Sequence, residues 1–163
     1  MGSRSGDLDP GVLIYLMREK KLDASMLEEL VDHRCGLFGI SGVGSDMRRL
    51  RKAASSNVDA RLAIEMFCCS VRKQIAAMIA VLDGVDLIVF TGGIGENEAQ
   101  ARATICSQLS WAGVSLDEAR NLTASNPISD SASRCAVRVL PSQEDEQIAR
   151  HTWSLISEGS QAA

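Results

Sequence analysis

The chain has 163 residues, of which 45% are hydrophobic and 23% charged, with a formal net charge of −4. This length suits one ordinary domain and is short for a two-lobed enzyme, and the balance of residue types is that of a folded globular protein. The acidic balance argues against a nucleic-acid or membrane-surface partner, and no apolar run approaches the ~20 residues of a membrane span. No secretory signal opens the chain, so we expect a cytoplasmic protein.

The first third of the chain predicts short helices. Asp9 before Pro10 is a helix start, because the carboxylate accepts from free N–H groups and proline loses nothing at the first helical position. This helix is predicted from Pro10 to about Lys20, and a second one over 24–33. Gly36 and Gly39 then predict a loop.

The middle of the chain predicts a capped helix and then a long one. Ser45 or Asp46 is expected to cap a helix over 47–54, which completes a small helical segment at about 10–56. From Asp59 to Leu82 apolar residues recur every three or four positions. Gly84 follows as a stop signal, so a long amphipathic helix is predicted here.

Two short strands are predicted in the second half. Asp86 to Thr91 is an apolar, β-branched run bounded by glycines, as is typical of a strand covered on both faces. A glycine turn follows, and then a helix over 98–112 with Gly113 as its cap. The second strand is predicted over Ala136 to Leu140.

The remaining segments predict a connection and a last helix. Residues 121–133 are polar and contain a proline, which indicates a loop. Ser142, with Asp145 three residues later, is close to a capping box and predicts a helix through Ile156, followed by a tail that frays from Ser157. Helices that alternate with two strands predict an α/β fold with a parallel strand pair.

The glycine-rich turn is the first candidate site. Gly92, Gly93 and Gly95 lie between a predicted strand and a predicted helix, where glycines let a ligand approach the backbone and a helix N-terminus favours anions. The spacing is neither that of a P-loop nor that of a Rossmann fingerprint. By chemistry alone, ligand binding and a plain tight turn both remain open.

Several charged residues have two interpretations. Arg4 lies among small residues, which leaves its guanidinium room to meet a phosphate, but a solvated terminal arginine looks the same in sequence. Asp46 and Arg48 are explained equally by a cap and a helix surface. Glu144, early in a helix, is explained by the helix dipole.

The chain has five cysteines in an odd count without a C-x-x-C pair. This pattern favours reduced, buried thiols over disulfides or a zinc site.

Four blocks of sequence, taken together and in order, resemble the acetate kinase family. They are Gly2-Ser3-Arg4-Ser5-Gly6-Asp7-Leu8-Asp9-Pro10, Ser41-Gly42 with Ser45-Asp46-Met47-Arg48, Phe90-Thr91-Gly92-Gly93-Ile94-Gly95-Glu96-Asn97, and Pro141-Ser142-Gln143-Glu144. The first and third blocks are the most specific. The resemblance extends from Met1 to about Trp153, and it is to the C-terminal portion of an acetate or propionate kinase.

The resemblance implies a fold and a reaction. The family belongs to the sugar kinase and actin superfamily, so the expected fold is an actin-like, ribonuclease H-like α/β domain that lacks its first strands. The implied reaction transfers a phosphoryl group between ATP and a short-chain carboxylate, acetate or propionate, with Mg²⁺. The partners implied are ATP or ADP, the carboxylate or acyl phosphate, and the missing N-terminal half, in an enzyme expected to be a homodimer.

The resemblance also assigns roles to individual residues. Arg4 matches the catalytic arginine that neutralises the transferring phosphoryl group, and Glu144 matches the magnesium-associated glutamate. The nucleotide-binding residues are matched by Asp46, Met47, Arg48, Gly93, Ile94, Gly95, Glu96 and Asn97. These roles suit phosphoryl transfer, which depends mainly on positioning and charge neutralisation.

This sequence departs from the family pattern mildly in two places and strongly in one. Ser3 stands where threonine is common, and Ser142-Gln143-Glu144-Asp145 stands where Thr-Asn-Glu-Glu is usual. The family's N-terminal groups have no counterpart here: an asparagine, a carboxylate-binding arginine, a catalytic aspartate, phosphate-contacting histidines and a glycine-rich phosphate hairpin. We therefore expect the isolated chain to be inactive.

Three functions are consistent with this sequence. In the first, residues 1–157 are the nucleotide-binding half of an acyl kinase, followed by a flexible tail at 158–163. In the second, the chain is a non-catalytic remnant that self-associates. In the third, it is a nucleotide-binding regulator. The DNA upstream of the first codon separates the first two, and tight ATP binding by the isolated chain is expected only of the third.

Overall fold

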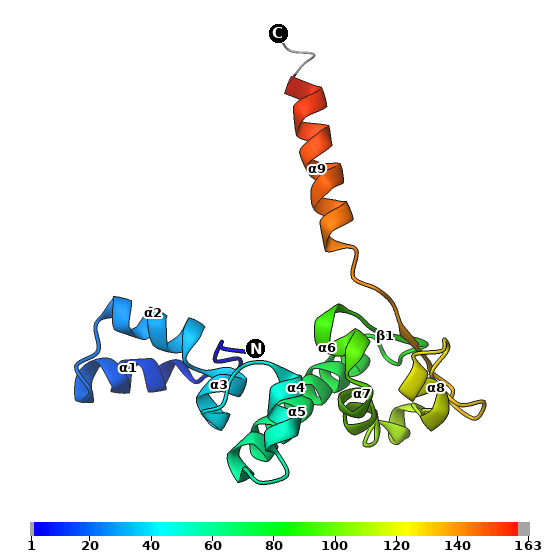
Figure 1. Ribbon diagram of the computed structural model, residues 1–163, viewed down its shortest axis with the longest axis horizontal. Helices are drawn as coiled ribbons and strands as arrows, with labels where there is room; N and C mark the ends of the chain where they lie inside the picture. Colours follow the sequence, from blue (N-terminus) through cyan, green and yellow to red (C-terminus); the bar gives the residue numbers. More distant parts are fainter. Residues whose placement is uncertain (1, 160–163) are drawn as a thin grey trace.

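The computed structural model describes residues 2–159 (Figure 1). Helices α1 (Pro10–Glu19) and α2 (Ala24–His33) confirm the predicted helical start and lie together at one end of the view. The Asp9 carboxylate accepts from the N–H of Gly11 at 2.7 Å, as expected of a helix cap.

The segment after α2 was predicted to be a loop, and this was wrong. Residues Gly36–Ser41 form helix α3, which ends at Gly42 in the left-handed region. Tertiary contacts explain the difference, because the carbonyls of Gly2 and Ser3 accept from the N–H groups of Phe38 and Cys35 at 3.0 and 2.8 Å. These contacts outweigh the low helix propensity of glycine.

Helices α4 (Met47–Ala53) and α5 (Val58–Val81) confirm the next two predictions. Asp46 is the cap of α4, and its carboxylate accepts from the N–H of Arg48 at 2.8 Å. Asn57 caps α5 through the N–H of Ala60 at 2.9 Å. Helix α5 packs against α3, α4 and α7 and is the centre of the fold.

The sheet consists of two parallel strands among the residues described. Strand β1 (Leu87–Phe90) pairs with β2 (Ala136–Val139) in a register that sets Leu87 opposite Ala136. The two strands confirm both strand predictions and the expected parallel pair.

The two outer edges of this sheet differ. On the outer side of β2, the Asn126 side chain accepts from the N–H of Val139 at 2.8 Å and donates to its carbonyl at 2.7 Å. The Ser129 hydroxyl accepts from the N–H of Val137 at 3.2 Å. Side chains, with the backbone N–H of Ile128 on the Val137 carbonyl at 2.8 Å, thus occupy the positions that a third strand would use on β2. Within the described residues only the far edge of β1 remains open.

The expected glycine turn is a short helix, α6 (Gly92–Asn97), which follows β1 directly. The prediction of a single helix over 98–112 was also wrong, because this segment forms two separate helical pieces. Helix α7 runs over Ala99–Cys106, and a 3₁₀ turn follows at Ser110–Ala112 and ends at Gly113 with φ 82°.

The connection between 113 and 136 is more ordered than predicted. Helix α8 (Glu118–Thr123) extends into the loop expected from residue 121, and Asp117 caps it by accepting from the N–H of Arg120 at 2.9 Å. Asp117 was the sequence signal for this helix. Leu116 and Ser129 form an antiparallel bridge that closes the connection on itself.

Helix α9 (Glu144–Gly159) stands away from the rest of the molecule (Figure 1). It begins two residues after Ser142 and continues beyond Ile156, where the sequence predicted its end. Residues 160–163 of the predicted tail lie outside the described residues. Within 2–159, no helix combines the length and apolar character needed to cross a membrane.

The core fills the space between α5, α7 and one face of the sheet. Ile88 and Phe90 of β1 point into it, and so do Ala101 and Ile105 of α7. The other face of β1 is exposed at Leu87 and Val89, next in sequence to the exposed carboxyl end of α5 at 81–82.

Candidate functional site

A small open pocket joins two of the sequence blocks. It has a volume of about 290 Å³ and is lined by Gly92, Gly93, Glu96 and residues 142–146. Glu96 connects its two walls, because one carboxylate oxygen accepts from the N–H of Gly92 at 2.9 Å and from that of Ser142 at 2.7 Å. This bridge brings segments 46 residues apart into one site.

The three glycines of α6 differ in whether the fold requires glycine at their positions. Gly92 has φ +72°, a conformation that strains any other residue. A Cβ on Gly95 would lie 3.2 Å from the backbone carbon of Phe90, so β1 packs too close for a side chain. Gly93 has neither constraint, since no atom lies within 4 Å of its ideal Cβ. The packing of the fold therefore does not require glycine at position 93.

The other residues of α6 divide between the pocket and the core. Asn97 is exposed and donates to the carbonyl of Gly93 at 2.9 Å. Ile94 packs against the core, so its side chain anchors α6. Of the predicted nucleotide-binding residues here, Gly93, Glu96 and Asn97 remain accessible to a ligand, and Gly95 and Ile94 set the conformation.

Glu144 lies at the start of α9 on the opposite wall. One of its carboxylate oxygens accepts from the Ser142 hydroxyl at 3.0 Å, and the side chain is exposed. Asp145 and Glu146 line the same pocket. Among residues 2–159 no group of three or more acidic, histidine or cysteine side chains is arranged to hold a metal. Oxygen donors of this kind suit Mg²⁺, which commonly takes one or two carboxylates and completes its shell with phosphates and water.

The second predicted nucleotide segment starts α4. The Arg48 guanidinium, with the N–H groups of Arg49 and Arg48, holds the pKa of Asp46 below its usual value. Asp46 therefore remains ionised at neutral pH. Met47 is 3% exposed and belongs to the core, so only its backbone is available to a ligand. Arg48 is exposed and pairs with Asp46 at 3.2 Å.

Arg4 lies apart from both segments. Its side chain is 76% exposed and makes a long ion pair of 3.9 Å with Asp32 of α2. Among the residues described it makes no hydrogen bond or ion pair with α4, α6 or α9. The N-terminal segment itself is fixed, because the N–H of Ser5 donates to the carbonyl of Val31 at 2.9 Å.

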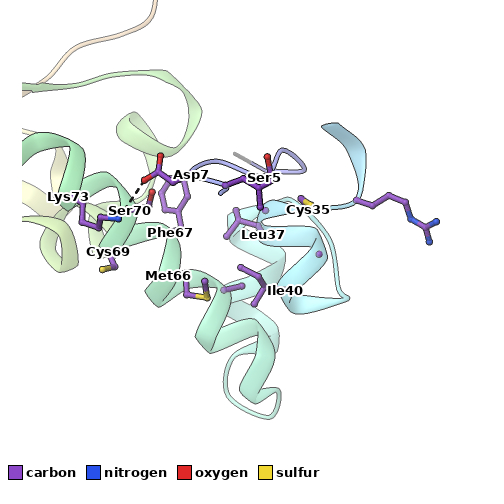
Figure 2. Close-up of a pocket in the computed structure, with 15 residues that line it drawn as sticks. Ser5, Asp7, Cys35, Leu37, Ile40, Met66, Phe67, Cys69, Ser70 and Lys73 are labelled. Carbon is purple, nitrogen blue, oxygen red and sulfur yellow. Dashed lines mark ion pairs between the residues drawn. The ribbon is translucent and has the colours of Figure 1, made fainter. Parts of the chain in front are cut away.

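A larger hollow lies beside the Arg4 block (Figure 2). It has a volume of about 500 Å³ between the N-terminal segment, α3 and α5, and its lining is largely apolar, with Leu37, Ile40 and Phe67. Asp7 and Lys73 form an ion pair of 3.6 Å at its side. It shares no residue with the pocket at α6, so the structure has two separate hollows that contain motif residues.

Sequence reasoning missed four polar residues next to α6. Arg102 is 2% exposed and Asn121 is 3% exposed, and they form a hydrogen-bonded pair. Arg51 and Glu98 form a mostly buried ion pair. The available signal was the position of Arg102 on the inward stripe of α7, three and four residues before Ile105 and Cys106. A charged residue at such a position has a buried partner.

Comparison with known proteins agrees with these motifs. Residues 1–150 match the model of the acetokinase family. The acetate kinase of Methylocella silvestris is 43% identical over 158 residues, which is 97% of this chain and 39% of that protein. The acetate kinase of Treponema denticola is 43% identical over 159 residues, covering 96% of this chain and 40% of the relative.

Solved structures share the fold. An acetate kinase from Porphyromonas gingivalis matches with a TM-score of 0.87 and 38% identity, over 96% of this chain and 40% of its own. A propionate kinase from Francisella tularensis matches with a TM-score of 0.82 and 34% identity, over 88% and 37%. The chain spans about 40% of the length of the curated relatives it matches. The fold is therefore part of the actin-like α/β domain expected, and the chain belongs to the acetokinase family.

Proposed function

We propose that this chain is the nucleotide-binding portion of an enzyme that transfers a phosphoryl group between ATP and acetate or propionate. The observation that carries the proposal is the pocket in which α6 and the start of α9 meet through Glu96. The open space at Gly93 supports it, because a glycine with no constraint from the fold leaves room for a ligand. Family membership supplies the substrate class.

The predicted nucleotide-binding and metal-binding residues have proposed tasks. Gly93 to Asn97 receive the adenosine part of ATP or ADP, and Asp46 to Arg48 line its ribose and adenine. Glu144 is proposed to hold Mg²⁺ together with phosphate oxygens, and the ion when bound offsets phosphate charge. Glu96 keeps the two walls at a fixed separation, because its carboxylate has partners on both of them.

Arg4 is the proposed catalytic arginine. Phosphoryl transfer concentrates negative charge on the transferring group, and a guanidinium stabilises it through two parallel hydrogen bonds. The ion pair of Arg4 with Asp32 is long and exposed, so it contributes little free energy and leaves the guanidinium free to turn toward a substrate.

The proposed partner is the remainder of the enzyme. Leu87 and Val89 are exposed on the face of β1, and Ile148 and Leu155 on α9. Parallel sheets are normally covered on both faces, so this surface fits a protein that continues beyond it. By the resemblance, the carboxylate pocket and further phosphate-binding groups belong to that remainder, in a homodimeric enzyme.

A second candidate function is a non-catalytic chain that binds itself. The same exposed apolar surface favours it, because such patches mark interaction sites. The two candidates differ in activity, since only the first gains turnover when the remainder of the enzyme is supplied.

Fusion to a relative separates the candidates. The chain is joined to the part of the Methylocella silvestris acetate kinase that lies outside the match, and acetyl phosphate formed from acetate and ATP is trapped as hydroxamate. We expect activity from the fusion, none from the chain alone, and loss of activity in a fusion carrying Arg4→Ala. A folded fusion that stays at the level of a no-protein blank contradicts the proposal.

A further inference from the structure

Arg102 is an arginine with almost no contact with solvent. It lies on α7 and is 2% exposed, and burial lowers the pKa of its guanidinium. Removing a guanidinium from water costs free energy unless its N–H groups find partners. Among the described residues none of its hydrogen-bond partners is a carboxylate, so neutral oxygens solvate the guanidinium, and the nearby Glu98 carboxylate favours its charged form.

All three nitrogens of the guanidinium are used. Nη1 donates to the carbonyls of Gly95 and Glu96 at 2.8 and 2.9 Å. Nε donates to the side-chain oxygen of Asn121 at 2.8 Å, and Nη2 donates to its carbonyl at 2.6 Å. The Asn121 amide donates in turn to the carbonyl of Ala99 at 2.8 Å. Arg102 therefore connects α6 to α8 through one planar group.

The two carbonyls on α6 depend on this arginine. Carbonyls in the last turn of a helix have no partner within the helix, and α6 has only six residues. A helix this short does not persist without external contacts. The guanidinium fork is rigid, so it fixes the direction of both carbonyls and with them the rest of α6.

We propose that Arg102, oriented by Asn121, is a positioning residue for nucleotide binding. It holds α6 in the conformation in which Gly93 faces open space and Glu96 reaches Ser142. The inference rests on the proposed function of the α6 pocket. Arg102 itself does not touch the ligand, because it lies beneath α6 rather than in the pocket.

Arg72, which is partly buried, supplies a control arginine outside α6. It lies on α5 and donates to the carbonyls of Ile105 and Thr104 at 3.1 and 2.7 Å, and also to the Gln108 side chain. Arg72 thus stabilises carbonyls of one helix, as Arg102 does, but it makes no hydrogen bond with α6. A general loss of packing affects both variants, whereas a loss of positioning affects only one.

The experiment compares Arg102→Ala with Arg72→Ala in the full chain, by calorimetric titration with ADP and Mg²⁺ and by amide hydrogen exchange over 91–98. If Arg102→Ala leaves α6 competent a tenth of the time, the apparent Kd for ADP rises about tenfold, and exchange over 91–98 approaches the rate of an unstructured chain. Arg72→Ala is expected to keep the parent's affinity and the parent's exchange in this segment. Added ethylguanidine is expected to restore ADP binding to Arg102→Ala.

The results distinguish a failure of this inference from a failure of the proposed function. ADP binding by Arg102→Ala with the parent's affinity, or equal losses in both variants, overturns the inference. Failure of the parent to bind ADP overturns the proposed function of the pocket and the inference with it. If Arg102→Ala does not melt cooperatively, Arg102→Lys is tested in its place, because lysine keeps the charge and the aliphatic stem but lacks the planar guanidinium. Arg102→Lys is expected to bind ADP more weakly than the parent does. Binding with the parent's affinity contradicts the inference.

Discussion

Arg51 Nε donates to a carboxylate oxygen of Glu98 at 2.7 Å, and both side chains are largely buried, at 22% and 11% exposure. A second nitrogen of Arg51 donates to Gln100 at 2.6 Å. Arg51 lies on α4, which carries the Asp46 segment, and Glu98 lies between α6 and α7. This ion pair therefore joins the two segments proposed to enclose the nucleotide.

Breaking this pair is expected to weaken the fold and the site together. Arg51→Met leaves the Glu98 carboxylate buried without its partner, which costs about 3 kcal/mol of unfolding free energy. The double variant Arg51→Met, Glu98→Gln is expected to recover part of this loss. Urea unfolding of the four proteins measures the coupling, and additive losses in the double variant contradict it.

Substitutions at Gly93 are expected to affect ligand binding without reducing the stability of the fold. Gly93→Ala is expected to leave the melting temperature unchanged or slightly raised, because nothing lies within 4 Å of the new Cβ and alanine favours a helix. Gly93→Val is expected to abolish ADP binding by occupying the pocket.

Gly92→Ala is the contrasting variant. With φ +72° at this position, it is expected to destabilise the chain by roughly 1–2 kcal/mol whether or not nucleotide is present. Thermal melting together with ADP titration distinguishes the two glycines. If Gly93→Val binds ADP like the parent, the nucleotide site lies elsewhere.

The five free cysteines differ in exposure and test the packing. Cys69 is exposed, whereas Cys68, Cys106 and Cys135 are buried, and burial raises the pKa of Cys106 to about 12. The thiolate is the reactive form, so at pH 8 an alkylating reagent is expected to modify Cys69 first and Cys106 only after unfolding. Mass spectrometry of timed samples measures the order. Rapid labelling of Cys106 in the folded chain contradicts the described core.

Much of the fold follows from local sequence signals. The helix over Pro10–Glu19 and the long helix over Val58–Val81 lie within one or two residues of their predicted bounds, because capping residues and apolar spacing are local. The helix over Gly36–Ser41 was not predictable, since it depends on carbonyls of the N-terminal segment. The burial of Arg102 depends on Asn121 of α8, a residue that was expected to lie in a loop.

The site was predictable to a similar extent. The motif blocks were found through resemblance, but nothing in the spacing of Glu96 and Ser142 indicates that a carboxylate bridges them. Such a contact depends on the parallel pairing of β1 and β2, which sets the ends of the two strands side by side. The separation of Arg4 from this pocket likewise became visible only in three dimensions.

The exposed apolar surface predicts how the isolated chain behaves. Leu82 is 70% exposed and Leu87 is 49% exposed beside the open edge of β1. Both features favour association of copies. Sedimentation is expected to show self-association or aggregation, and the fusion described above is expected to melt at a higher temperature. A monomeric chain that melts cooperatively as high as the fusion refutes this expectation.

Amide chemical shifts test whether nucleotide binds between α6 and the start of α9. In a ¹⁵N-labelled chain titrated with ADP and Mg²⁺, we expect shifts that saturate at Gly93, Glu96 and Ser142, with smaller ones at 46–48. The Gly93→Val variant is predicted to lose them. Shifts confined to the hollow beside the Arg4 block, or no shifts at any ADP concentration, would show that the nucleotide does not bind at α6.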